Sequence, residues 1–227
     1  IDLNYLTNIN YGDSLDIDNM IKTYSEIESI DSTITTDHLF TAILYDKINK
    51  PILEITKPLL KHIQLFSKDI KGYEFLANLY FNNQQYLDAI HYYHRIILIN
   101  PNHVYANLKL TECLIYFEDY KNAFKKLNLI IKIDENNFKG KYYTGYCLYQ
   151  TKNYTEAIRE FTHALLLNSE DAATYYYLGK SYSAIDRKKQ ALEAFIVSSQ
   201  LNPFDGDTHF ELGKIYESVL KKKLALE

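Results

Sequence analysis

Two histidines, His91 and His94, come closest to a metal-binding arrangement in this sequence. Side chains three residues apart share one face of a helix, and two imidazoles at that spacing can bind a metal ion. The sequence supplies no third ligand beside them, so we interpret the pair as exposed, half-packed histidines. We predict no metal site and no cofactor.

Sequence motifs for catalysis are missing. The chain contains no His-Glu-x-x-His zinc motif, no glycine-rich phosphate loop and no nucleophile elbow. The scattered Asp and Glu residues are better explained as helix surface than as paired catalytic acids. We therefore predict that the chain is not an enzyme.

The most regular feature of the chain is an alanine at every 34th residue. Glycines stand 12 residues before three of these alanines, and large apolar residues stand four residues after four of them. A period of about 20 to 50 residues means that one structural unit is copied in tandem. The alanines are Ala89, Ala123, Ala157, Ala191 and Ala225, the glycines are Gly145, Gly179 and Gly213, and the large residues are Tyr93, Leu127, Phe161 and Phe195.

The segment 175–182 reads Tyr-Tyr-Tyr-Leu-Gly-Lys-Ser-Tyr and is followed by Ala191, Phe195 and Pro203. It resembles the motif of the tetratricopeptide repeat (TPR), W-x2-L-G-x2-Y, then A-x3-F, then P, with Tyr in place of Trp. The resemblance implies an all-α fold, a right-handed α-solenoid of stacked antiparallel helix pairs. It implies four full units followed by a truncated fifth repeat or capping helix, with the bounds 70–103, 104–137, 138–171, 172–205 and 206–227.

The repeat pattern has a physical reason. Gly179 and the small Ala191 allow the two helices of a unit to approach closely, and larger residues such as Phe195 fill the space around them. Neither helix can bury its apolar face alone, so neighbouring units stabilise one another. Cys113 and Cys147 are also 34 residues apart, which places them on equivalent helices about 10 Å apart, too far for a disulfide. We predict two reduced, buried thiols.

Residues 1–69 are less regular. Apolar residues over 17–27 have the spacing of an amphipathic helix. The span 36–69 has the length of one unit, and we interpret it as a degenerate repeat. Pro51 suits the first turn of a helix within it, and Pro58 is expected to kink or restart that helix. The alternative is that this region caps the solenoid or forms a dimer contact.

Composition and charge exclude several classes of protein. The net charge of −4 and the pI near 6.0 provide no positive field for a nucleic-acid backbone, so helical-repeat RNA binding is disfavoured. No apolar stretch reaches the length of a transmembrane helix, and no signal segment opens the sequence. We expect no nucleic-acid partner, no membrane insertion and an intracellular, cytoplasmic location, with the nucleus as an alternative.

In the TPR family the first helix of each unit lines a concave groove. Positions 2, 5, 9, 12 and 13 usually face the groove, and position 6 borders it. By this resemblance the chain offers tyrosines beside lysines, which suits an extended peptide because rings supply rigid contact area and polar groups bind its backbone. The candidate residues are Phe75, Asn78, Tyr105, Lys109, Glu112, Tyr116, Lys139, Tyr142, Tyr143, Tyr146, Tyr149, Tyr176, Tyr177 and Lys180.

Not every candidate ring need face a ligand. Tyr142 and Tyr176 hold a position that is often aromatic in TPRs, where the ring only packs between neighbouring helices. Tyr146 and Tyr149 are expected to be more exposed, because the groove position of Tyr146 is usually polar.

One TPR subtype, the cochaperones that bind the C-terminal carboxylate of Hsp70 or Hsp90, is not matched. Its clamp uses Lys, Asn, Asn, Lys and Arg at positions where this chain has Glu74, Asn78, Lys109, Lys139 and Tyr143. The negative charge of Glu74 would repel a carboxylate, so we predict no clamp of this kind.

These features predict a non-catalytic scaffold that binds a partner peptide or helix in a Tyr-rich groove within a multi-subunit assembly. The alternative is a substrate-recruiting or regulatory segment of a larger enzyme whose catalytic domain lies outside this chain. The repeat register is unfinished after Ala225, which favours this alternative. A homodimer through the N-terminal region or the last helix is also open, because both leave apolar helix faces.

Overall fold

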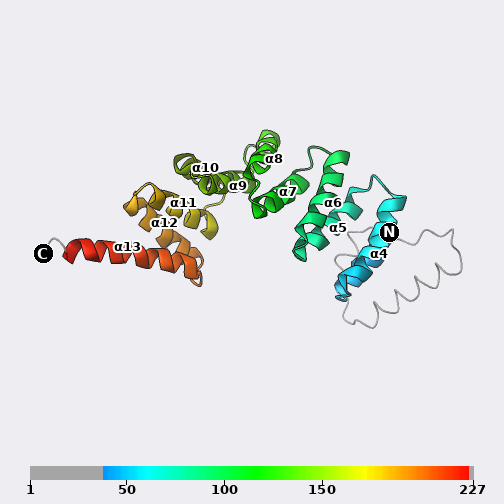
Figure 1. Cartoon of the computed structure of the whole chain (residues 1–227), viewed down its shortest axis with the longest axis horizontal. Coiled ribbons are helices and arrows are strands. Elements are labelled where there is room, and N and C mark those ends of the chain that lie inside the picture. The colour runs from blue at the N-terminus through cyan, green and yellow to red at the C-terminus, as the bar shows by residue number, and fades with distance from the viewer. Residues whose placement is uncertain (1–37, 225–227) are drawn as a thin grey trace. The chain divides into compact units, whose positions relative to one another are not determined.

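The computed structural model describes residues 38–224, and every regular element within that range is an α-helix (Figure 1). The predicted helix over 17–27 and the alanine Ala225 lie outside the described residues. The helices are α3 His38–Lys47, α4 Ile52–Leu65, α5 Ile70–Asn82, α6 Tyr86–Ile99, α7 Val104–Tyr116, α8 Tyr120–Ile133, α9 Phe138–Gln150, α10 Tyr154–Leu167, α11 Ala172–Ala184, α12 Lys188–Leu201 and α13 Gly206–Leu224. The predicted all-α fold of helix pairs is confirmed.

The chain divides into two compact units, residues 1–99 and 100–227. The described part of the first unit consists of two packed helix pairs, α3 with α4 and α5 with α6. In the second unit α7 packs with α8, α9 with α10 and α11 with α12, and α13 packs on α12. None of the helices between residues 38 and 224 combines the length and apolar composition that a membrane crossing requires.

The first helix of each repeat begins at the same position of the 34-residue period. These helices, α5, α7, α9, α11 and α13, begin at residues 70, 104, 138, 172 and 206. A polar side chain immediately before the helix caps it: Asn137 accepts a hydrogen bond from the Gly140 N–H at 2.9 Å, and Asp171 accepts one from the Thr174 N–H at 2.8 Å. Such side chains accept hydrogen bonds from backbone N–H groups of the first helical turn, which have no partner within the helix.

The turns inside the helix pairs repeat as well. Gln84, Glu118, Lys152 and Asp186 have positive φ angles of 60°, 57°, 64° and 58°. A residue in this left-handed conformation commonly ends a helix, and glycine adopts it most readily. This chain reverses direction at each turn with a non-glycine residue instead.

Glycine and phenylalanine meet where the paired helices cross. A Cβ atom placed on Gly145 would lie 2.8 Å from the Phe161 ring, and one on Gly179 would lie 2.8 Å from the Phe195 ring. Both phenylalanines and Ala191 are completely buried. The predicted close approach of helices at Gly179 and Ala191 is therefore confirmed.

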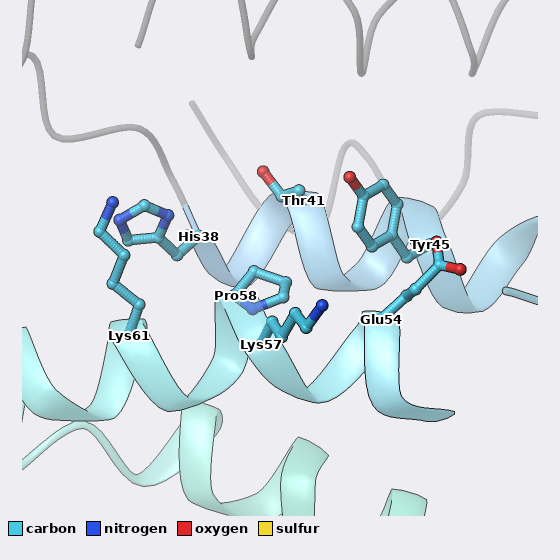
Figure 2. A pocket seen from close by; sticks show the side chains of 7 residues that line it. All are labelled: His38, Thr41, Tyr45, Glu54, Lys57, Pro58 and Lys61. Carbon is cyan, nitrogen blue, oxygen red and sulfur yellow. The ribbon is translucent and has the colours of Figure 1, made fainter. Parts of the chain in front are cut away.

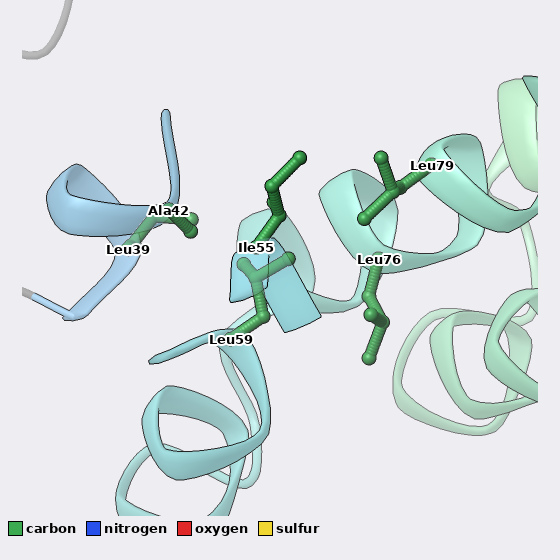
Figure 3. Close-up of a cluster of buried hydrophobic side chains, with 6 residues drawn as sticks. All are labelled: Leu39, Ala42, Ile55, Leu59, Leu76 and Leu79. Atoms are coloured by element: carbon green, nitrogen blue, oxygen red, sulfur yellow. The ribbon is translucent and has the colours of Figure 1, made fainter. Parts of the chain in front are cut away.

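In the first unit α3, α4 and α5 share one apolar core (Figure 3). Pro51 stands immediately before α4, and α4 continues without interruption through Pro58. Of the two outcomes expected at Pro58, a kink or a restart of the helix, the restart is therefore wrong. Ile55 and Leu59 are buried on either side of it in the sequence, so apolar packing maintains the helix although the proline removes one backbone hydrogen bond. The core residues are Leu39, Ala42, Ile55, Leu59, Leu76 and Leu79.

The last helix, α13, is longer than the first helices of the other repeats. Helices α9 and α11 have 13 residues, whereas α13 has 19 and continues past the position where a turn would follow. One side of α13 packs through Leu212 and Ile215 on the buried Ala191 and Phe195 of α12. Within the described residues, no second helix pairs with α13 as α12 pairs with α11.

Candidate functional site

Five tyrosines on α9 and α11 form a connected group of rings, which we call the tyrosine surface: Tyr142, Tyr146, Tyr149, Tyr176 and Tyr177. The first three share one face of α9, because residues separated by three or four positions lie on the same side of a helix. Tyr177 of α11 lies at the centre of the group. Its ring centroid is 4.9 Å from that of Tyr146, 5.7 Å from Tyr149, 6.4 Å from Tyr142 and 5.1 Å from Tyr176.

The rings of the tyrosine surface are half-buried. Tyr146 and Tyr149 are thus less exposed than their groove positions suggest, because the Tyr177 ring packs against both of them edge-on. Burial raises the pKa of Tyr142 and of Tyr177 well above the ordinary tyrosine value. Their hydroxyl groups therefore remain protonated at neutral pH, and the hydroxyls of Tyr177 and Tyr146 share a hydrogen bond.

Lys180 and Glu211 bring a charged pair to the edge of the tyrosine surface. The Lys180 ammonium donates a hydrogen bond to Glu211 at 2.9 Å and lies 5.9 Å from the centre of the Tyr176 ring. Lys214 also donates to Glu211, at 2.9 Å. Partial burial acts to raise the pKa of Glu211, but the hydrogen bonds from Lys214 and Lys180 outweigh it and hold that pKa below its ordinary value.

Glu211 and Lys214 were not among the residues predicted from the sequence. Lys214 stands 34 residues after Lys180, so the repeat period could have revealed it. Glu211 occupies the position that Tyr177 holds one unit earlier, and only the packing of α13 shows that it pairs with Lys180.

A second polar group joins α7 to α9. The Lys109 ammonium donates to Glu112 at 2.7 Å, and Glu112 also accepts a hydrogen bond from the hydroxyl of Tyr143. Burial, followed by the charge of Glu112 and this hydrogen bond, raises the pKa of Tyr143 well above its ordinary value. Lys109, Glu112 and Tyr143 are all predicted site residues and lie together, but their polar groups form hydrogen bonds with one another.

The remaining predicted site residues are more scattered. Tyr105, Tyr116 and Lys139 are exposed on α7 and α9 of the second unit. Phe75 and Asn78 belong to α5 of the first unit, where Phe75 packs on the apolar core and Asn78 accepts a hydrogen bond from Tyr93 at 2.6 Å. The amide oxygen of Asn78 thus takes part in an internal contact.

The two cysteines are structural. Cys113 and Cys147 are free thiols with no exposed surface, as predicted. Burial raises the pKa of each thiol to about 12. Both sulfurs are therefore protonated and unreactive near neutral pH.

The histidine pair on α6 is exposed, and the His91 ring lies edge-on to Tyr92 with centroids 4.9 Å apart. Within residues 38–224, no group of three or more His, Cys, Asp or Glu side chains is arranged to hold a metal ion.

The cavity between α3 and α4 was not predicted from the sequence (Figure 2). It has a volume of about 500 Å³. Figure 2 shows Lys61 beside His38 at one end and Glu54 beside Tyr45 at the other. This mixture of charges indicates no particular class of ligand. The lining residues are His38, Thr41, Tyr45, Glu54, Lys57, Pro58 and Lys61.

Comparison with known proteins agrees with the repeat pattern. A family model described as tetratricopeptide repeat matches residues 70–103. No curated protein sequence matches the chain. Solved structures with the same fold are similar at low sequence identity.

Three of these structures indicate the extent of the likeness. YrrB, described as a TPR protein with an unusual peptide-binding site, is 17% identical with a TM-score of 0.68, covering 84% of this chain and 98% of YrrB. A TPR protein from Parabacteroides merdae is 16% identical with a TM-score of 0.71, covering 92% of this chain and 82% of its own. MamA from Desulfovibrio magneticus is 22% identical with a TM-score of 0.62, covering 69% of this chain and 89% of the MamA chain. Residues 70–103 therefore match the tetratricopeptide repeat, and the chain has the all-helical fold of these TPR structures.

Proposed function

We propose that this chain is a non-catalytic protein–protein interaction scaffold whose second unit binds an extended peptide or a helix of a partner protein on the tyrosine surface. The observation that carries this proposal is the gathering of five tyrosine rings from two neighbouring helices, with Lys180 at their edge. The rings offer apolar area, and the hydroxyl and ammonium groups offer hydrogen bonds to a peptide backbone.

The packing of the rings supports a binding role on energetic grounds. A side chain that is already held by its neighbours loses little conformational entropy when a ligand arrives. Tyr177 contacts four other tyrosines, so much of this ordering is complete before binding. The same fold in YrrB, described as having a peptide-binding site, also supports the proposal.

Selection of peptides on the full chain tests the proposal. A displayed library of random extended peptides is selected against the chain, and the recovered peptides are measured by fluorescence anisotropy. We expect Tyr146→Ala/Tyr149→Ala to weaken binding by about tenfold or more, because aromatic residues contribute most of the energy of such contacts. The milder Tyr146→Phe/Tyr149→Phe pair keeps the rings and tests the hydroxyl groups alone.

Leu166→Ala is the matched control. Leu166 lies on α10, in the same repeat as Tyr146, and its side chain is exposed. This variant should retain full affinity, and circular dichroism should show that all variants are folded. Peptides that bind both tyrosine variants as tightly as the wild type would place binding on another surface and refute the proposal.

A further inference from the structure

A cavity of about 360 Å³ lies among α4, α5 and α6 of the first unit and shares no residue with the tyrosine surface. Its most buried lining residue is Tyr73 of α5, which is 4% exposed. Leu60 and Ile63 of α4 line it as well and give it apolar surface. Arg95 of α6 brings a positive charge to this surface, and we call the site the Arg95 cavity.

The guanidinium of Arg95 lies over the Tyr73 ring, with its central carbon 5.9 Å from the ring centre. This cation–π contact orients the group but leaves its N–H donors unused. Within residues 38–224, no carboxylate forms an ion pair with Arg95, and the side-chain amide of Gln64 beside it forms no hydrogen bond. The cavity thus offers donors that the described part of the chain does not satisfy.

The hydroxyl of Tyr92 is a further donor in the lining. Burial raises the pKa of Tyr92, and the neighbouring Tyr80 and the charge of Asp88 add to this, so the hydroxyl stays protonated at neutral pH. The Tyr80 ring stacks on Tyr92 with centroids 5.6 Å apart and holds it in place. Asp88 itself does not line the cavity, and neither does any other acid.

The repeat 138–171 shows what the chain places at the same position elsewhere. Two repeats after His91 and Tyr92, which both line the cavity, stand Arg159 and Glu160. Glu160 is 7% exposed, and its carboxylate lies 3.2 Å from Arg159 and 3.7 Å from Lys141. In that repeat a carboxylate of the chain is therefore held among basic groups, whereas in the repeat 70–103 the acid is replaced by a tyrosine.

We infer that the Arg95 cavity binds a carboxylate joined to an apolar chain, such as a glutamate side chain next to a leucine in a peptide. The planar guanidinium can bind both oxygens of a carboxylate, and Leu60 and Ile63 provide contacts for the apolar part. A phosphate carries about −1.5 to −2 charges at pH 7, more than the single guanidinium balances. This site is separate from the tyrosine surface, so either proposal can fail alone.

The same chemistry is available from two sources. Residues 1–37 contain eight Asp and Glu residues and a single lysine, so this chain can supply the carboxylate itself. An acidic peptide of another protein is the other source. The test therefore has one arm for the chemistry of the site and one for the source of its ligand.

Phenylbutyrate, a carboxylate with an apolar body, is the probe for the chemistry. It is titrated into the full chain carrying isotope-labelled arginine, and the side-chain N–H signals are followed by NMR. The chain has only three arginines, Arg95, Arg159 and Arg187, so the signals are easily assigned. We expect the Arg95 signal alone to shift and saturate. Phenylbutyramide, which has the same shape without the charge, should bind at least about tenfold more weakly.

Variants of exposed residues locate the site, with affinity measured from the NMR signals of the probe. Arg95→Gln should weaken binding of phenylbutyrate by at least about tenfold, because the charged hydrogen bonds are lost. Gln64→Glu should do the same by placing a negative charge in the cavity. Arg159→Gln is the matched control, since its side chain is 65% exposed in the second unit, and it should bind like the wild type. Circular dichroism should show that all three are folded.

A probe that leaves the Arg95 signal unshifted, or that binds no more tightly than its amide, would overturn the inference. So would equal binding by wild type and Arg95→Gln. The source is assigned with a full-length variant in which every Asp and Glu of residues 1–37 is replaced by Asn or Gln. Binding of the probe at least about tenfold tighter than in the wild type identifies this segment as the occupant, and unchanged binding identifies an external peptide.

Discussion

Gly145 and Gly213 are equivalent residues of the repeat with different surroundings, and the difference decides what a methyl group does at each position. At Gly145 the added Cβ would lie 2.8 Å from the Phe161 ring, a distance that side chains do not tolerate without movement. The ring is completely buried and cannot shift into solvent. At Gly213 the same atom would enter open space.

We predict that Gly145→Ala destabilises the chain by about 1–3 kcal/mol, the usual cost of overpacking a core, even though alanine favours the helix. Gly213→Ala should instead stabilise it by up to about 1 kcal/mol, since only the helix propensity changes. Chemical denaturation followed by circular dichroism measures both. Equal effects of the two substitutions would show that the Gly145–Phe161 contact does not constrain the repeat.

The buried thiols give a second prediction for single residues. Burial raises the pKa of Cys113 and Cys147 to about 12, so almost no thiolate exists near pH 8. Iodoacetamide should therefore leave both cysteines unmodified in the native chain and alkylate both in denaturant. Mass spectrometry of the two samples checks this. Rapid alkylation of the native chain would contradict the burial of the thiols.

The turn between α9 and α10 shows how a helical element ends under strain. Lys152 has a φ angle of 64°, a left-handed conformation in which a Cβ atom is crowded by the backbone. Glycine has no such crowding, although it gains more conformational freedom in the unfolded chain.

We predict that Lys152→Gly stabilises the chain by about 0.5–1 kcal/mol, because relief of the crowding exceeds the entropic cost. Lys152→Ala removes the same charged side chain but keeps the Cβ atom, so it should give no such gain. Thermal unfolding of the two variants, at the same ionic strength, separates the effect of the backbone from that of the charge. A gain shared by both variants would point to the charge.

The helices themselves were predictable from the sequence, because the same apolar positions recur every 34 residues and each helix must bury them against its neighbour. The uninterrupted α4 was not, since the effect of Pro58 depends on how well Ile55 and Leu59 are buried, which no local pattern records. The central position of Tyr177 in the tyrosine surface was not predictable either, because it depends on the distance between α9 and α11. A period specifies equivalent positions within repeats, but not how side chains of successive repeats meet.

At the scale of the whole molecule, the second unit contains several tyrosines whose hydroxyl pKa values are raised because the side chains are partly buried. Tyr142, Tyr143 and Tyr177 have strongly raised pKa values, with burial as the first cause in each case. In repeat proteins each unit is stabilised by contacts with its neighbours, so the loss of one interface weakens the array beyond that interface. Ionisation of these tyrosines should therefore affect the stability of the whole unit.

The direction of the pH effect follows from the raised pKa values. Above the ordinary tyrosine pKa of 10.0, the unfolded chain releases protons that the native chain retains at Tyr142 and Tyr177. The stabilisation is complete below pH 10 and is lost as the pH rises above that value toward the native pKa. Urea unfolding should be measured at increasing pH. Below pH 10 these tyrosines should contribute a constant amount to the free energy of unfolding, and above pH 10 their contribution should fall.

Tyr142→Phe/Tyr177→Phe removes the ionisable hydroxyls and keeps the rings, so this variant should lose less stability than the wild type above pH 10. Tyr116→Phe is the matched control, because it removes the hydroxyl of an exposed side chain in the same unit and should follow the wild type. Tyrosinate absorbance, recorded with the unfolding, shows whether ionisation accompanies the loss of structure. If the double variant and the wild type lose stability equally, alkaline unfolding arises from other groups, and the burial of Tyr142 and Tyr177 does not control the stability of the second unit.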